Sequence, residues 1–119
     1  MTPDLDMLDR ECAEIMGWTF DAPFPCLYGR DKEGQPGMGE ICPRATRDPA
    51  AFLALLRWHT TAERCIHISA DSSGAYCDLS EENTGRLLGT TPGGTDNPMV
   101  ALALATSSWH RSHAPGGAT

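Results

Sequence analysis

The side chains that could perform acid–base or nucleophilic chemistry gather around one expected pair of strands. Residues 65–70 alternate between polar and apolar side chains, and residues 75–79 follow after turn-forming residues. If both strands form a hairpin, His67 and Asp78 face one another, and a carboxylate there can orient an imidazole. The alternation directs Cys77 to the opposite face, away from His67. We interpret His67 and Asp78 as an exposed cross-strand contact, and we predict that the protein is not an enzyme.

A second chemical pattern combines tryptophans with arginines. Each tryptophan lies at the end of an expected helix or just beyond it, where its simplest role is to seal the core. Aromatic rings also stack on planar ligands, and arginines bind phosphates. The alternative hypothesis is a small-molecule site for a nucleotide. Its residues would be Trp18, Arg44, Arg47 and Trp58.

The five cysteines form no short-spaced ligand pair. Their odd number and irregular spacing favour free thiols in a reducing compartment over a disulfide framework. A zinc site would have to combine Cys26 and Cys42 with a distant histidine such as His59 or His67, which is not the usual spacing of zinc ligands. We therefore predict no metal and no cofactor.

The elements that must position these side chains are three helices and a small sheet. Proline follows a capping residue at each expected helix start, which favours helices over residues 3–16, 49–59 and 98–110. The first is capped by Thr2 and the third by Asp96 or Asn97. The hairpin and a third strand near residues 84–90 make up the sheet. We predict an α+β fold with a mostly antiparallel sheet of two to four strands packed against three α-helices.

Proline and glycine are concentrated in residues 21–43, which predicts a long loop with short extended pieces at 25–28 and 39–42. Its glycines match neither the dinucleotide-binding spacing nor the phosphate-loop spacing. Residues 111–119 contain little to bury. We predict one domain over residues 1–110, with residues 111–119 as a flexible tail.

Charge limits the partners of this chain. The 119 residues carry a formal charge of −7, which disfavours nucleic acids and anionic membranes. No apolar run is long enough to span a bilayer, and the N-terminus lacks a secretory signal, so we expect a cytoplasmic protein. Acidic residues are concentrated on the first helix, as a solvated face or as a surface that docks on a basic partner. These partner-binding candidates are Asp4, Asp6, Asp9, Glu11 and Glu14.

Three stretches of the chain resemble small phage and prophage proteins with a phage α/β/α sandwich domain. They are LDRECAEIMGW at residues 8–18, RATRDPAAFLALLRW at 44–58 and TDNPMVALALATSSWHR at 95–111. The resemblance covers a little under half of the chain and implies a small sheet flanked by helices. Because the family has no established common activity, it assigns no functional residue.

From these observations we expect a non-enzymatic phage or mobile-element protein that binds and inhibits a host bacterial protein in the host cytoplasm. Immune effectors of the CRISPR kind and other defence proteins are candidate targets. If the partner normally binds nucleic acid, an acidic surface would imitate the phosphate backbone. The alternative is sequestration of a nucleotide. An exposed sheet edge also leaves pairing with a second copy open.

Overall fold

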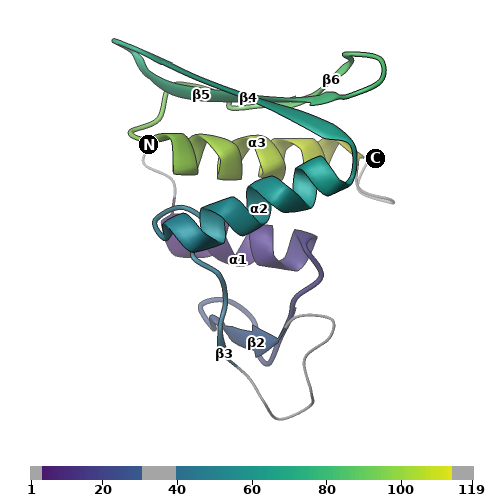
Figure 1. The fold of residues 1–119 in the computed structure, drawn as a ribbon. Helices are drawn as coiled ribbons and strands as arrows, with labels where there is room; N and C mark the ends of the chain where they lie inside the picture. The colour runs from purple at the N-terminus through teal and green to yellow at the C-terminus, as the bar shows by residue number, and fades with distance from the viewer. Residues whose placement is uncertain (1–3, 31–39, 114–119) are drawn as a thin grey trace.

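The computed structural model describes residues 4–30 and 40–113. Within these ranges it has three helices and two three-stranded antiparallel sheets, so the predicted α+β class is confirmed (Figure 1). The elements are α1 (Leu5–Ile15), β1 (Thr19–Phe20), β2 (Tyr28–Arg30), β3 (Glu40–Ile41), α2 (Pro49–Thr61), β4 (Arg64–Asp71), β5 (Gly74–Glu81), β6 (Leu87–Thr90) and α3 (Pro98–His113).

Side-chain caps define where the helices begin. The Asp48 side chain accepts a hydrogen bond from the backbone N–H of Ala50 at the start of α2, as predicted. Asn97, one of the two predicted caps, binds the first turn of α3 in the same way. The first helix begins at Leu5 with Asp4 as its cap, so the predicted start at residue 3 is wrong. The predicted cap Thr2 lies outside the described residues.

The helix ends differ from the sequence prediction in one important place. Gly17 follows α1 with a φ of 108°, a conformation that glycine adopts without strain, and it ends that helix as expected. The third helix continues to His113, so residues 111–113 are helical and do not belong to a flexible tail. Residues 114–119, the rest of the predicted tail, lie outside the described residues.

The larger sheet has the strand order β4-β5-β6. The predicted hairpin is confirmed, with His67 directly opposite Asp78 and a tight turn between Asp71 and Gly74. The third strand starts at Leu87, because a turn occupies the residues before it. Figure 1 shows α2 and α3 together on one face of this sheet, with α1 on the far side of α3.

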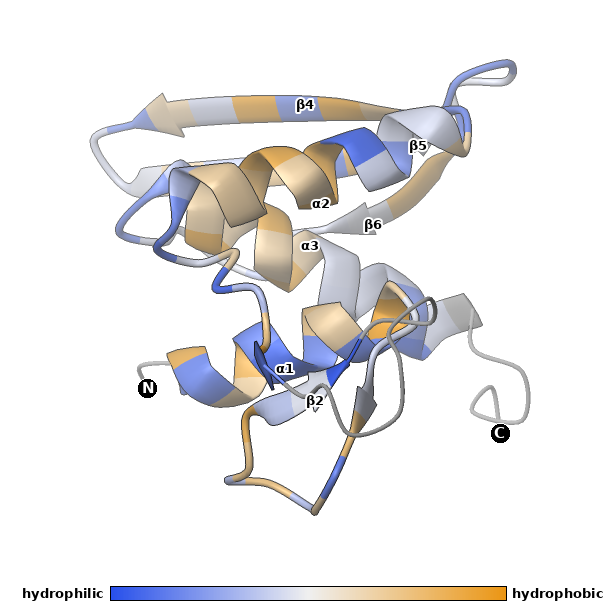
Figure 2. Ribbon diagram, turned by 60° about the horizontal axis from the view of Figure 1, so that its bottom comes forward, coloured by the Kyte–Doolittle hydropathy of each residue, from blue (hydrophilic) through white to orange (hydrophobic). Residues whose placement is uncertain are grey.

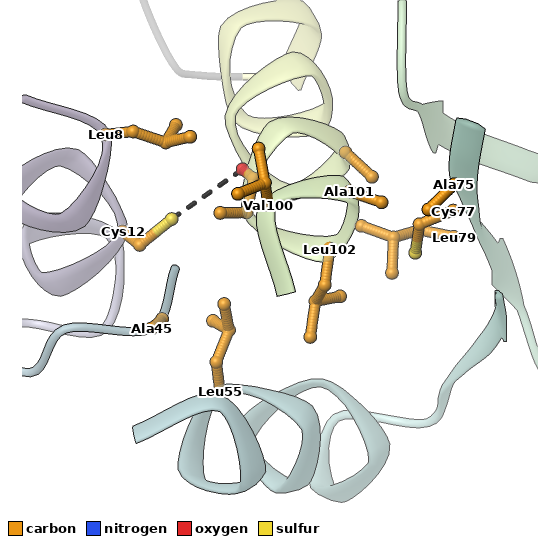
Figure 3. Close-up of a cluster of buried hydrophobic side chains, with 12 residues drawn as sticks. Leu8, Cys12, Ala45, Leu55, Ala75, Cys77, Leu79, Val100, Ala101 and Leu102 are labelled. Carbon is orange, nitrogen blue, oxygen red and sulfur yellow. Dashed lines mark hydrogen bonds between the residues drawn. The ribbon is translucent and has the colours of Figure 1, made fainter. Parts of the chain in front are cut away.

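The third helix lies at the centre of the core because it packs against both the sheet and α1 (Figure 3). Leu102 of this helix is completely buried, as are Leu55 of α2 and Leu79 of β5. The many alanines of α3 allow neighbouring elements to approach this helix closely. At Gly89 of β6, a Cβ atom would lie only 2.7 Å from the Cβ of Trp109.

A second sheet lies mostly in the segment 21–43, which was predicted to be a loop with short extended pieces at 25–28 and 39–42. Strands β1, β2 and β3 pair in that order, with Thr19 opposite Arg30 and Tyr28 opposite Ile41. The prediction of a single sheet is therefore wrong. Two- and three-residue strands are too short to show an alternating pattern in the sequence. The connection between β2 and β3, residues 31–39, lies outside the described residues.

Candidate functional site

The acidic side of α1 is not the solvated face that its spacing suggested. Asp9 is 0% exposed, and its carboxylate accepts hydrogen bonds from the backbone N–H of Thr46 at 3.0 Å and from Arg47 Nη2 at 3.2 Å. Asp6 binds Arg47 at 2.6 Å and Arg44 at 3.3 Å. The expectation of a solvent-facing Asp9 is wrong, because it joins α1 to the segment before α2.

The remaining acids of α1 are also partly engaged. Glu11 forms an ion pair with Arg111 at 3.2 Å, and Glu14 lies 3.6 Å from Arg10. Arg10 is mostly buried, since its guanidinium covers the ring of Phe20 and also donates to backbone carbonyls. Asp4 and Glu14 are the two exposed carboxylates of the predicted partner surface. Arginines of the same chain therefore balance much of the charge on α1.

The predicted nucleotide site does not assemble from the four residues named for it. Arg44 and Arg47 are held together by Asp6. Trp18 contacts Phe20, with ring centroids 6.2 Å apart. Trp58, at the other end of α2, packs against a different arginine. Sequence distance alone cannot show that these side chains have separate partners.

That arginine is Arg64, the first residue of β4. Its guanidinium lies over the rings of two tryptophans. Its guanidinium carbon lies 4.7 Å from the ring centroid of Trp58 and 4.4 Å from that of Trp109. The two rings meet edge to face at 6.0 Å. With His59, whose ring lies 5.8 Å from that of Trp109, these residues form what we call the Arg64 cluster. Elements far apart in the chain thus meet at the junction of α2 and β4.

His59 is fully buried in this cluster, and its hydrogen bonds specify a neutral ring. Thr106 donates its hydroxyl hydrogen to the carbonyl of Leu102, so His59 Nε2 donates to Thr106 Oγ1 at 2.8 Å. The other ring nitrogen, Nδ1, accepts from Arg64 Nε at 2.8 Å. Burial and then the charge of Arg64 lower the pKa of His59 to about 3. The ring is therefore a fixed acceptor that orients Arg64.

A cavity of about 320 Å³ lies beside the Arg64 cluster. Arg64, Arg86, Glu63, Glu81 and Trp109 contribute to its lining. Arg86 is bound to Glu81 at 3.2 Å, whereas no carboxylate within the described ranges forms an ion pair with Arg64. Burial lowers the pKa of Arg64, the direction expected when a cation loses water without gaining a counter-charge. An anion in this cavity would supply that counter-charge.

The sequence did not identify Arg64, because this residue lies between the helix predicted over 49–59 and the strand predicted over 65–70. One arginine after a helix has no spacing that predicts a site. Trp58 is recognisable as a helix-end residue, but its partner Trp109 is about fifty positions away in the chain. Contact information would have been needed to find the cluster.

The predicted cross-strand pair is present without forming a catalytic arrangement. His67 and Asp78 are directly opposite and exposed, and Asp78 accepts a hydrogen bond from Thr90 at 2.6 Å. No hydrogen bond joins His67 to Asp78 in the part of the chain described. Burial raises the pKa of the Cys77 thiol to about 12, with a smaller contribution from Asp78. A thiol in that state is a poor nucleophile.

A larger groove of about 460 Å³ runs between α1 and α3. It is lined by Asp4, Met7 and Glu11 of α1, and by Leu104 and Arg111 of α3. Met7 is 51% exposed, which is high for a large apolar side chain on a packed helix. The groove therefore combines an apolar surface with carboxylates, although Glu11 is paired with Arg111.

Comparison of the chain with protein-family models, with curated proteins and with solved structures gave no match. The resemblance to phage α/β/α sandwich proteins thus stays a prediction. Among residues 4–30 and 40–113, none of the helices has the length and apolar character needed to cross a bilayer. The Arg64 cluster and the α1–α3 groove are the two candidate binding sites of the described chain.

Proposed function

We propose that this is a non-enzymatic binding protein that takes a small anionic ligand, such as a nucleotide, through Arg64. The observation that carries the proposal is a partly buried arginine beside a cavity, without a carboxylate partner in the described chain. Buried or half-buried charges are normally paired, because removing a charge from water is costly. A bound carboxylate or phosphate would complete this environment.

The arginine is also well oriented for such a ligand. The rings of Trp58 and Trp109 hold the guanidinium carbon between them, and the bond to His59 fixes the position of Nε. The terminal nitrogens are then left as a fork suited to two oxygens of one anion. The cavity is within the usual size range of small-molecule sites.

Ligand recognition in this cavity would depend on the orientation of the Arg64 guanidinium more than on the net charge of the lining. Glu63 and Glu81 line the same cavity as its two arginines, and Glu81 is paired with Arg86, so the lining as a whole has no excess of positive charge. An anion must therefore approach the fork of Arg64 without meeting these carboxylates. This favours a compact phosphate or carboxylate group over an extended polyanion.

Titration of intrinsic tryptophan fluorescence tests the proposal, because Trp109 lines the cavity and Trp58 contacts Arg64. Inorganic phosphate, a mononucleotide and a dicarboxylate are suitable probes. Arg64→Gln should weaken the binding of an active probe by about tenfold or more. Arg64→Lys keeps the charge but loses the fork, so its affinity should fall in between. Arg57→Gln, on the exposed side of α2, is the matched control.

The proposal fails if none of the three probes changes the fluorescence. It also fails if Arg64→Gln and Arg57→Gln bind a probe as tightly as the wild type does. Thermal unfolding of each variant separates loss of the site from loss of the fold. A variant that unfolds at the wild-type temperature but does not bind the probe supports the proposal.

A second function, capture and inhibition of a basic host protein by a phage or mobile-element protein, is favoured by the groove between α1 and α3. Its support is the exposed Met7 between Asp4 and Glu11, together with the resemblance to phage proteins. The most informative charge changes are Asp4→Asn, which keeps a side chain able to cap α1, and Glu14→Lys, since Asp6 binds two arginines and Asp9 is buried. Asp96→Lys, at an exposed loop position, is the control.

In a pull-down from bacterial lysate, a specific partner should bind the wild type and Asp96→Lys. It should be lost from the Asp4→Asn/Glu14→Lys double variant. Equal retention by all three proteins would remove the acidic surface from consideration. A retained nucleotide without a protein would instead favour the Arg64 cavity.

A further inference from the structure

Strand β4 forms one edge of the larger sheet, and alternate residues of it direct their backbone groups away from β5. The N–H and C=O groups of Ala75 bond to Thr95 on the other side of β5, and the C=O of Cys77 bonds to Thr91 in the same direction. Their partners Ala70 and Ile68 are therefore at positions without hydrogen bonds between β4 and β5. By the same alternation, four residues of β4 present backbone donors and acceptors to the open edge. They are Arg64, Ile66, Ile68 and Ala70.

This edge lacks the features that usually prevent strands from pairing. It is eight residues long, and its register with β5 has no bulge. Residues 65–70 contain no charged residue and no proline. Figures 1 and 2 show no other labelled element alongside the outer side of β4. In the described chain, no backbone hydrogen bond from Ile66, Ile68 or Ala70 crosses this edge.

The inner face of β4 is also incompletely covered. Ile66 and Ile68 point toward the helices but are only half-buried. Their cross-strand neighbours on β5, Leu79 and Cys77, are almost completely buried. Apolar exposure thus increases toward the open edge, where another strand would cover it.

We propose that β4 of a second copy of this chain pairs antiparallel with β4 across a two-fold axis at His67. In this register Ile66 pairs with Ile68 of the second copy, and Arg64 pairs with Ala70. Four such pairs, each exchanging two bonds, give about eight intermolecular hydrogen bonds. On the inner face, the four isoleucines of the two copies become neighbours. The two three-stranded sheets join into one continuous sheet.

The register follows from the alternation of the edge groups. A shift of one residue would place outward-facing groups opposite inward-facing ones, so it is excluded. A shift of two residues leaves three hydrogen-bonded pairs instead of four. Residues 65–70 contain no Asp, Glu, Lys or Arg, so the pairing of the two strands places no such like charges directly opposite one another there.

Disulfide cross-linking tests this register directly. His67 would face His67 of the second copy at a position without hydrogen bonds, where Cα atoms lie about 4.5 Å apart. With Cys65→Ser as the background, His67→Cys should form a covalent dimer under mild oxidation. Ser69→Cys in the same background is the matched control on the same exposed face. Its copies would be separated by about 14 Å and should not cross-link.

Light scattering coupled to size exclusion measures the association without a cross-link. The wild type should elute at twice the monomer mass at micromolar concentration. His67→Lys places two like charges opposite one another at the axis and should give a folded monomer. Ser112→Lys, with the same added charge on α3, should remain dimeric. A wild-type monomer, or equal cross-linking of the His67→Cys variant and its Ser69→Cys control, would overturn the proposal.

Discussion

Replacing His59 with glutamine should remove part of the acid sensitivity of the fold. The pKa of this buried ring is lowered to about 3, against 6.5 in the unfolded chain. Between those values the unfolded state binds a proton that the folded state does not bind. Acid therefore favours unfolding, and the loss of stability begins below about pH 6.5.

The magnitude follows from the size of the pKa change. Each pH unit within this window is equivalent to about 1.4 kcal/mol for one proton. His59 alone should therefore lower the free energy of unfolding by about 2 kcal/mol between neutral pH and about pH 5. Glutamine does not titrate, and its amide can still hydrogen-bond to Thr106. The variant starts less stable at neutral pH but loses less stability in acid.

Urea denaturation followed by circular dichroism at about pH 7 and about pH 5 measures this difference. The gap between wild type and His59→Gln should shrink by about 2 kcal/mol at the lower pH. His110→Gln, an exposed histidine on α3, controls for loss of an imidazole from the surface. If wild type and His59→Gln lose equal stability, His59 is not held neutral by burial and the argument is refuted.

Three further predictions concern packing and charge contacts and use the same denaturation measurement. Thr46→Val should stabilise the fold by about 1 kcal/mol, because it removes a buried hydroxyl that has no hydrogen-bond partner in the described structure. A loss of stability would show that this hydroxyl is satisfied. Asp9→Asn should cost about 2–4 kcal/mol, whereas the half-exposed Asp6→Asn should cost under about 1 kcal/mol. Equal costs would contradict the burial argument. Gly89→Ala should cost about 1–3 kcal/mol because its Cβ would press into α3, while Gly93→Ala meets open space and should be almost neutral.

The helices and the hairpin were predictable because their signals are local. Asp48 followed by proline begins a helix whatever the rest of the chain does, and its carboxylate does bind the first turn. The alternation around Ile66 and Ile68 correctly placed the two isoleucines on the inner face and His67 on the outer one. These features depend on neighbours within a few positions, which the sequence shows directly.

The charge pattern of α1 was misleading because its partners come from another part of the chain. Asp9 binds the backbone of Thr46, which is 37 positions away. Helical periodicity placed Asp9 off the apolar stripe, but a polar side chain can face inward where an arginine and a backbone N–H meet it. Some of the acidic side chains of α1 thus hold this helix to other parts of the fold. The number of acidic residues in the sequence of α1 therefore overstates the negative charge that is exposed to a partner.

The Arg64 cluster was unpredictable for a similar reason. Trp58 and Trp109 were both recognised as helix-end residues, but their edge-to-face contact depends on how α2 and α3 pack. Only that packing gives Arg64 two rings to cover. The strands of the second sheet were predicted only in part. β3 lies within the extended piece predicted at 39–42, whereas β2 shares only Tyr28 with the piece predicted at 25–28. The two residues of β1 cannot display a period.

Anion binding and self-association depend on different groups of β4, so one proposal can fail without the other. Ligand binding depends on the Arg64 side chain, whose direction is set by His59 and the two tryptophans. Self-association depends on backbone groups along the strand and on the absence of Asp, Glu, Lys and Arg from residues 65–70. Arg64→Gln removes the anion-binding fork but leaves the edge amides in place, so its dimer should persist. His67→Lys separates the copies without touching the cluster. Anion binding that persists in the separated copies would therefore place the complete ligand site within a single chain.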